Sequence, residues 1–157
     1  MQNELNIIDA LFLRQPSYIV LISSLLPNLE EVVADVAKDL NFTYLCFNHI
    51  ETDYNPVNKR VHQLLEKKQQ GIIVCGSSFP TDKLDFHVNY HIHLSLNKTM
   101  FSELKIKTDY DTYTEGLKSN FINKYINIKP EFDVQKIGDE IFNRIINHID
   151  SIVHVKK

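Results

Sequence analysis

Three short apolar runs separated by two amphipathic segments constrain the fold of this chain most strongly. The runs lie at residues 18–23, 42–50 and 71–79, and the first and third are apolar on both faces. Segments 28–40 and 59–70 between them repeat apolar residues at helical spacing. Strands buried on both faces and joined by helices are typical of parallel sheets with right-handed crossovers. We therefore predict an α/β fold with three α/β/α layers and a mainly parallel sheet.

The rest of the chain adds four predicted elements and no second domain. A short helix is expected at 3–15, stopped by Pro16, and a strand with strict alternation is expected at 85–97. A lid-like segment at about 99–127 is predicted to be helical, and 132–153 is predicted to form an amphipathic helix with isoleucines along its apolar side. With no internal repeat or low-complexity segment, residues 1–157 are predicted to form a single domain.

Composition and charge exclude several classes of partner. The net charge of −3 provides no basic excess for binding nucleic acid. No window of about 18 apolar residues suits a membrane span, and the N-terminal residues fit no signal-peptide pattern. Cys46 and Cys75 lie within apolar runs and are expected to be buried thiols in a reducing compartment, the cytoplasm or a virion. The bias towards Asn, Lys, Ile, Tyr and Phe is typical of AT-rich genomes, those of large DNA viruses among them.

The stretch LISSLLPNLEEVV, Leu21 to Val33, joins the first strand to the first helix, where many α/β proteins bind phosphate. The working motif there is G-x-x-x-x-G-K-[ST]. Neither register of this stretch restores a glycine, the lysine or the hydroxyl residue. Aligned on the helix, the four motif positions hold Ser23, Asn28, Leu29 and Glu30, or, shifted by one, Ser24, Leu29, Glu30 and Glu31.

The stretches YIVLIS, VVADVAKDLNFTYLCFN and GIIVCGSSFP…HIHLSL resemble P-loop nucleoside and nucleotide kinases, uridine-kinase-like proteins in particular. The resemblance covers roughly residues 17–150 and rests on element order and apolar pattern. It implies a P-loop NTPase-like fold, a lid at about 99–127 and an activity that uses ATP and Mg²⁺. It also implies that Ser23, Ser24 and Asn28 occupy the phosphate loop. In an active member, Glu51 or Asp53 after the second strand would be the base that takes the substrate proton.

Three departures from that pattern predict a degenerate phosphate site. The loop lacks its lysine, and Glu30 and Glu31 put carboxylates where a triphosphate would lie, at a Coulombic cost on the order of several kcal/mol. The third strand ends without an acid, and no arginine lies in the lid-like segment. The hydroxyl that would hold Mg²⁺ is also absent.

A histidine pair offers a different chemistry. His91 and His93 are two residues apart on a predicted strand, so both point to one face, together with His87. An H-x-H strand binds metal in amidohydrolase-type barrels, but this chain is too short for such a barrel and lacks the later ligands. We expect a half-exposed polar strand face, with a metal site or a pH-sensitive contact as alternatives.

These observations favour a catalytically inactive P-loop-kinase-like domain that is retained as a binding or assembly module, in a virus particle or another complex. A protein partner or self-association is expected, and no cofactor. The alternative is an active nucleoside or nucleotide kinase with an atypical phosphate loop, using ATP and Mg²⁺. A metal-dependent hydrolase built on His91 and His93 is a third hypothesis.

Overall fold

The computed structural model describes residues 7–8, 17–47, 53–104 and 108–154. Most of the predicted helix at 3–15 therefore lies outside the described residues, as does the end of the predicted strand at 42–50. The strands in the described part are β1 (Tyr18–Ser23), β2 (Thr43–Phe47), β3 (Gly71–Gly76), β4 (Tyr90–Leu96) and β5 (Lys124–Ile128). The helices are α2 (Leu29–Leu40), α3 (Asn55–Glu66), α4 (Lys98–Ser102), α5 (Tyr110–Gly116) and α6 (Val134–Val153), with 3-10 turns η1 (Thr81–Lys83) and η2 (Leu117–Ser119).

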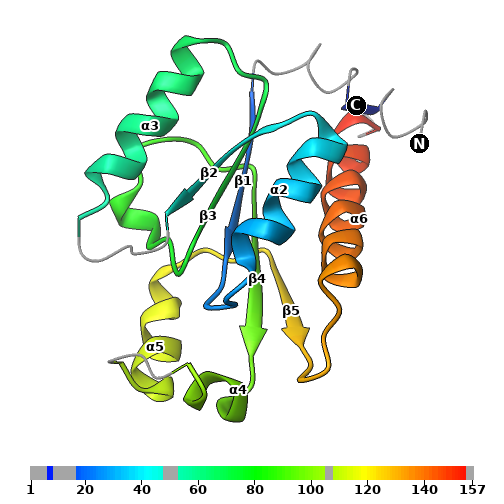
Figure 1. The fold of residues 1–157 in the computed structure, drawn as a ribbon. Coiled ribbons are helices and arrows are strands. Elements are labelled where there is room, and N and C mark those ends of the chain that lie inside the picture. Colours follow the sequence, from blue (N-terminus) through cyan, green and yellow to red (C-terminus); the bar gives the residue numbers. More distant parts are fainter. Residues whose placement is uncertain (1–6, 9–16, 48–52, 105–107, 155–157) are drawn as a thin grey trace.

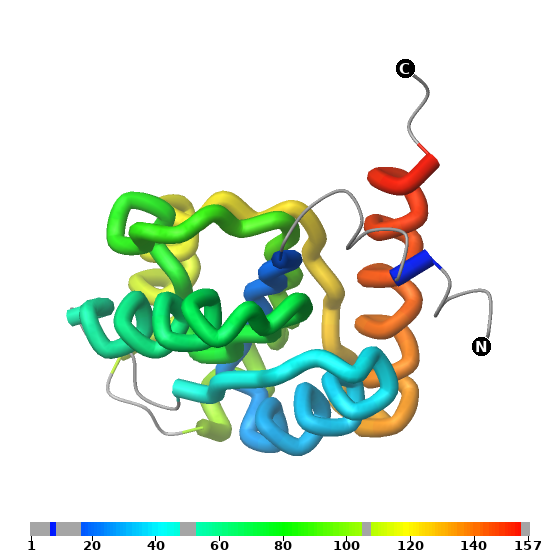
Figure 2. Tube along the Cα trace, turned by 90° about the horizontal axis from the view of Figure 1, so that it is seen from above, coloured from blue at the N-terminus to red at the C-terminus, as the bar shows by residue number. Residues whose placement is uncertain are grey.

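The described strands form one parallel sheet in the order β2-β3-β1-β4-β5. Helices α2 and α6 lie on one face, and α3 and α5 lie on the other (Figure 1). Viewed from above, α6 and α5 lie on opposite sides of the central strands (Figure 2). The predicted three-layer α/β/α architecture with a parallel sheet is therefore confirmed.

Two apolar clusters hold the layers together. The larger one lies between the sheet and the pair α2–α6, where the isoleucine seam of α6 meets the valines of α2. The smaller one lies between the sheet and α3 and includes Val57, Val61 and Phe79. Because β1 and β3 contribute side chains to both clusters, their wholly apolar sequences are explained by burial on both faces.

Several predicted boundaries are wrong. Helix α3 begins at Asn55, four residues before the expected start, because Pro56 suits the first helical turn. Strand β4 begins only at Tyr90. The lid-like segment at 99–127 is not one helix: it contains α4, α5, η2 and the first residues of β5. The fifth strand was not predicted, and it turns β4 from an edge strand into an inner one.

The helices in the described ranges include none that is both long and apolar enough to cross a membrane. The longest, α6, is amphipathic, and its apolar side packs in the core.

Candidate functional site

Three backbone donors of the loop between β1 and α2, those of Ser24, Leu26 and Leu29, bind acceptors within the protein. The Ser24 N–H donates to the Gly76 carbonyl at 2.9 Å, and the Leu29 N–H donates to the Leu26 carbonyl at 3.2 Å. The Leu26 N–H donates to Ser24 Oγ at 3.0 Å, and that hydroxyl donates to the Leu94 carbonyl at 2.8 Å. A phosphate loop instead directs successive N–H groups at the anion.

The side chains of this loop fill space on the α2–α6 side of the sheet. Leu26 and Leu29 are buried and belong to the larger core cluster. Within the described stretch 17–47, Asn41 is the residue with a positive φ angle, and it lies at the far end of α2. The described loop therefore has no left-handed residue of the kind that shapes an anion-binding nest, and Leu26 and Leu29 occupy the core instead.

The residues predicted for the phosphate loop occupy different environments. Ser23 and Ser24 are buried and their hydroxyls are hydrogen-bonded. Asn28 is exposed at the N-cap position of α2, and its side chain makes no capping hydrogen bond. Glu30 and Glu31 are exposed in the first turn of α2, where carboxylates interact favourably with the helix dipole.

Of the two residues predicted as a base in an active enzyme, the structure describes Asp53. Glu51 lies outside the described residues. Asp53 is exposed, and its Oδ1 accepts a hydrogen bond from the Asn55 N–H at 3.0 Å, at the entrance to α3. This contact gives Asp53 a local structural role in organising the start of the helix.

His91 and His93 form a buried cluster with Ser23. His91 Nε2 and His93 Nδ1 each lie 2.8 Å from Ser23 Oγ. The histidines are only 1% and 2% exposed, so the predicted half-exposed face is wrong. The reason is that β5 pairs with β4, while α5 and Phe79 cover this face.

Burial decides the charge of both rings. Burial, with a smaller contribution from the neighbouring His93, lowers the pKa of His91 to about 3. Burial likewise lowers the pKa of His93 to about 4. Both imidazoles are therefore neutral near pH 7. Because Ser23 is fully enclosed, no substrate carbonyl can reach its hydroxyl, and the cluster is a polar network within the fold rather than a nucleophilic site.

A metal at the histidine pair would need further ligands. Among the described residues, no group of three or more His, Cys, Asp or Glu side chains is arranged to hold a metal ion. One nitrogen of each ring is already bonded to Ser23 Oγ, which leaves at most one nitrogen per ring for coordination.

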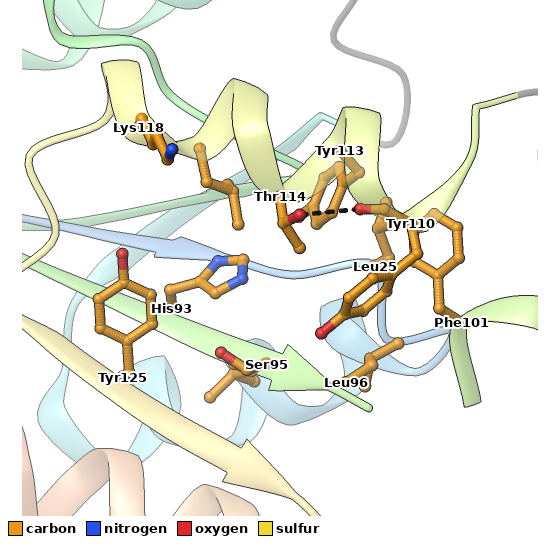
Figure 3. A pocket seen from close by; sticks show the side chains of 12 residues that line it. Leu25, His93, Ser95, Leu96, Phe101, Tyr110, Tyr113, Thr114, Lys118 and Tyr125 are labelled. Atoms are coloured by element: carbon orange, nitrogen blue, oxygen red, sulfur yellow. Dashed lines mark hydrogen bonds between the residues drawn. The ribbon is translucent and has the colours of Figure 1, made fainter. Parts of the chain in front are cut away.

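A cavity of about 300 Å³ lies beside His93, under α5 (Figure 3). We call it the His93 pocket. Its walls are mostly aromatic and aliphatic, with a few polar atoms from the strands. It is lined by Leu25, His93, Leu94, Ser95, Leu96, Phe101, Tyr110, Tyr113, Thr114, Leu117, Lys118 and Tyr125. The sequence indicated that the lid-like segment is rich in tyrosine, but no spacing pattern predicted that its tyrosines would pack beside His93 on β4.

The architecture places the chain among proteins with a P-loop NTPase-like fold. A gluconokinase from Sinorhizobium meliloti 1021 has a similar structure, with a TM-score of 0.50 and 9% identity, covering 88% of this chain and 94% of that one. A shikimate kinase from Aquifex aeolicus vf5 gives a TM-score of 0.49 at 15% identity, covering 83% and 96%. No family model matches the sequence, and no curated protein does. At these identities the likeness concerns the fold alone.

Proposed function

We propose that this chain is a catalytically inactive P-loop-kinase-like domain that serves as a binding module. The observation that carries the proposal is the β1–α2 loop. Leu26 and Leu29 are packed in the core, and the N–H groups of Ser24, Leu26 and Leu29 donate to acceptors within the protein. A kinase needs that loop to wrap and neutralise a triphosphate.

The residues present do not fit Mg-ATP. Residues 23–31 contain no cation, and they carry two carboxylates at the helix start. A nucleotide could enter only if the loop opened, which would expose Leu26 and Leu29 to water. Exposing a leucine costs about 1.5–3 kcal/mol, so binding there would have to overcome that cost as well as the charge repulsion.

We propose that the module binds a protein partner or a second copy of this chain. Phe121 and Tyr125 are the exposed large hydrophobic residues of the described chain, at 72% and 54% exposure. Exposed aromatic residues favour contact with a protein or a second copy of the chain. Residence in the cytoplasm or in a virus particle stays a prediction from composition.

Thermal unfolding with and without Mg-ATP and Mg-GTP tests the loss of nucleotide binding. A ligand present at 100 times its Kd would stabilise the fold by about 2.7 kcal/mol. For a domain of this size that corresponds to a shift in Tm of about 5–11 °C. We expect no shift with either nucleotide.

A double variant, Glu30→Gln with Glu31→Gln, serves as the matched control. Both side chains are exposed, so the fold should tolerate the change. If the loop binds triphosphate, the wild type will show a nucleotide-dependent shift and the variant a larger one, because repulsion is removed. That result would overturn the proposal in favour of an active kinase with an atypical loop.

A further inference from the structure

The hydrogen bonds of the buried cluster assign its protons. The His91 ring hydrogen-bonds to the backbone of Phe121, and a carbonyl can only accept, so the nitrogen facing Phe121 is protonated. His91 Nε2, the nitrogen that faces Ser23, is then an acceptor and receives the Ser23 hydroxyl proton. The Ser23 oxygen in turn accepts from His93 Nδ1.

The same chain of bonds leaves one nitrogen without a proton. His93 also hydrogen-bonds to the Ser23 backbone, which agrees with a proton on Nδ1. In a neutral ring with Nδ1 protonated, Nε2 is a bare acceptor. The cluster therefore presents one fixed acceptor, held in place by the Ser23 and His91 contacts.

This acceptor faces the His93 pocket. His93 lines the cavity, and its ring lies between Tyr125, Ser95 and α5 (Figure 3). In the described part of the chain, the fully enclosed side-chain nitrogen or oxygen without a partner is Asn120 Nδ2. Because His93 Nε2 has no hydrogen bond among the described residues and is not enclosed in that way, this edge of the ring reaches the surface of the cavity, although His93 as a whole is only 2% exposed.

The walls of the pocket favour a flat, uncharged ring. Phe101, Tyr110 and Tyr125 provide ring faces and edges, and Tyr113 is held by a hydrogen bond from its hydroxyl to the Ser77 carbonyl at 2.6 Å. The cationic side chain in the lining, Lys118, is largely exposed and lies 2.9 Å from a carboxylate oxygen of Glu115. A neutral histidine and an ion-paired lysine screened by solvent give little attraction for an anion.

We propose that the His93 pocket binds an uncharged aromatic ring compound, of one or two fused rings, whose N–H or O–H group donates a hydrogen bond to His93 Nε2. The cavity of about 300 Å³ is at the lower end of the range for small-molecule sites. The inference rests on the proposed function, because it names a ligand class for the binding module.

Indole and benzofuran form a matched pair of probes, since they share a shape and only indole has an N–H donor. The chain contains no tryptophan, so indole fluorescence reports binding directly, and both probes can be followed by protein NMR. We expect indole to bind about three- to tenfold more tightly than benzofuran. We also expect indole to shift the ¹⁵N resonance of His93 Nε2 upfield, while His148, on the opposite face beside Tyr18, stays unchanged.

Two variants sharpen the test. His93→Phe should make the affinities for indole and benzofuran equal. Because His93→Phe replaces a buried residue, a second variant tests the same pocket without changing His93. Thr114→Phe changes a half-buried residue of α5 and should fill the cavity, so that both probes lose binding.

Equal binding of the two probes to the wild type, an unmoved His93 Nε2 resonance with indole, or unchanged binding in Thr114→Phe would each overturn the inference. So would a failure of both probes to bind. None of these results changes the Mg-ATP measurement, which tests the proposed function separately.

Discussion

The packing of the β1–α2 loop predicts a large difference between two adjacent leucines. Leu26 is buried in the core beneath α2, whereas Leu25 is half-buried and lines the His93 pocket. Truncating a buried leucine to alanine costs about 2–5 kcal/mol, from lost burial and the cavity that remains. We expect Leu26→Ala to cost about 3 kcal/mol and Leu25→Ala less than about 1 kcal/mol.

Urea unfolding followed by circular dichroism measures both variants. For a small domain, a loss of about 3 kcal/mol lowers the urea midpoint by about 1–2 M at an unchanged m-value. Leu25→Ala is the matched control, because it makes the same change one residue away in the same loop. If the two variants unfold at the same midpoint, the loop is not anchored in the core, and the main argument for a lost phosphate site fails.

Further predictions concern a crowded glycine and the buried histidines. A Cβ on Gly71 would overlap the Phe42 ring, so Gly71→Ala should lower the free energy of unfolding, measured in urea, by about 1–3 kcal/mol. Gly116 lies in helical backbone with open space around it, so Gly116→Ala should leave that free energy unchanged or raise it by up to about 1 kcal/mol. Burial lowers the pKa of His91 and His93 in the folded protein to about 3 and 4, so below pH 6.5 the unfolded chain binds protons at these rings more readily than the folded one. The free energy of unfolding should be unaffected by the two rings above pH 6.5 and should fall as pH is lowered, by about 2 kcal/mol for each ring at pH 5. Unfolding midpoints that stay level over that range, or NMR signals of the His91 and His93 rings that titrate near pH 6.5 in the folded protein, would refute this.

The central strands and the last helix were predictable because burial imposes simple patterns on them. Tyr18–Ser23 and Gly71–Gly76 are buried on both faces, and their sequences are continuous apolar runs. The isoleucines of α6 recur every three or four residues, and most of them are buried. In these elements local pattern and tertiary burial agree.

The fifth strand could not be predicted because its local pattern favours a helix. Tyr113, Leu117, Phe121 and Tyr125 recur every four residues, which is the spacing of a helix face. Strand β5 has only five residues, and it forms an edge whose side chains alternate between buried and exposed. Its pairing with β4 is a long-range contact that no local window contains.

The environment of the histidines depended on that missed strand. An edge β4 would leave His91 and His93 half-exposed, as the alternating sequence indicated. Once β5 pairs with β4 and α5 covers the same face, both rings are almost wholly buried, and the nitrogens turned towards β1 need partners. Ser23 supplies these partners because its register on β1 sets it opposite His93. The candidate site therefore follows from tertiary pairing, and the sequence contributed only the residue types.

The β1–α2 loop links the two proposals made for this protein. Leu26 packs in the α2–α6 layer. On the other face of the sheet, the Ser23 hydroxyl bonds to His93 and Leu25 lines the His93 pocket. A loop that opened to hold a triphosphate would withdraw Leu26 from the core and disturb the Ser23 hydroxyl that orients His93. Nucleotide binding at the loop and a fixed acceptor in the pocket therefore compete for the same few residues. The packed loop favours the pocket, and this is the physical reason to expect a binding module rather than a phosphotransferase.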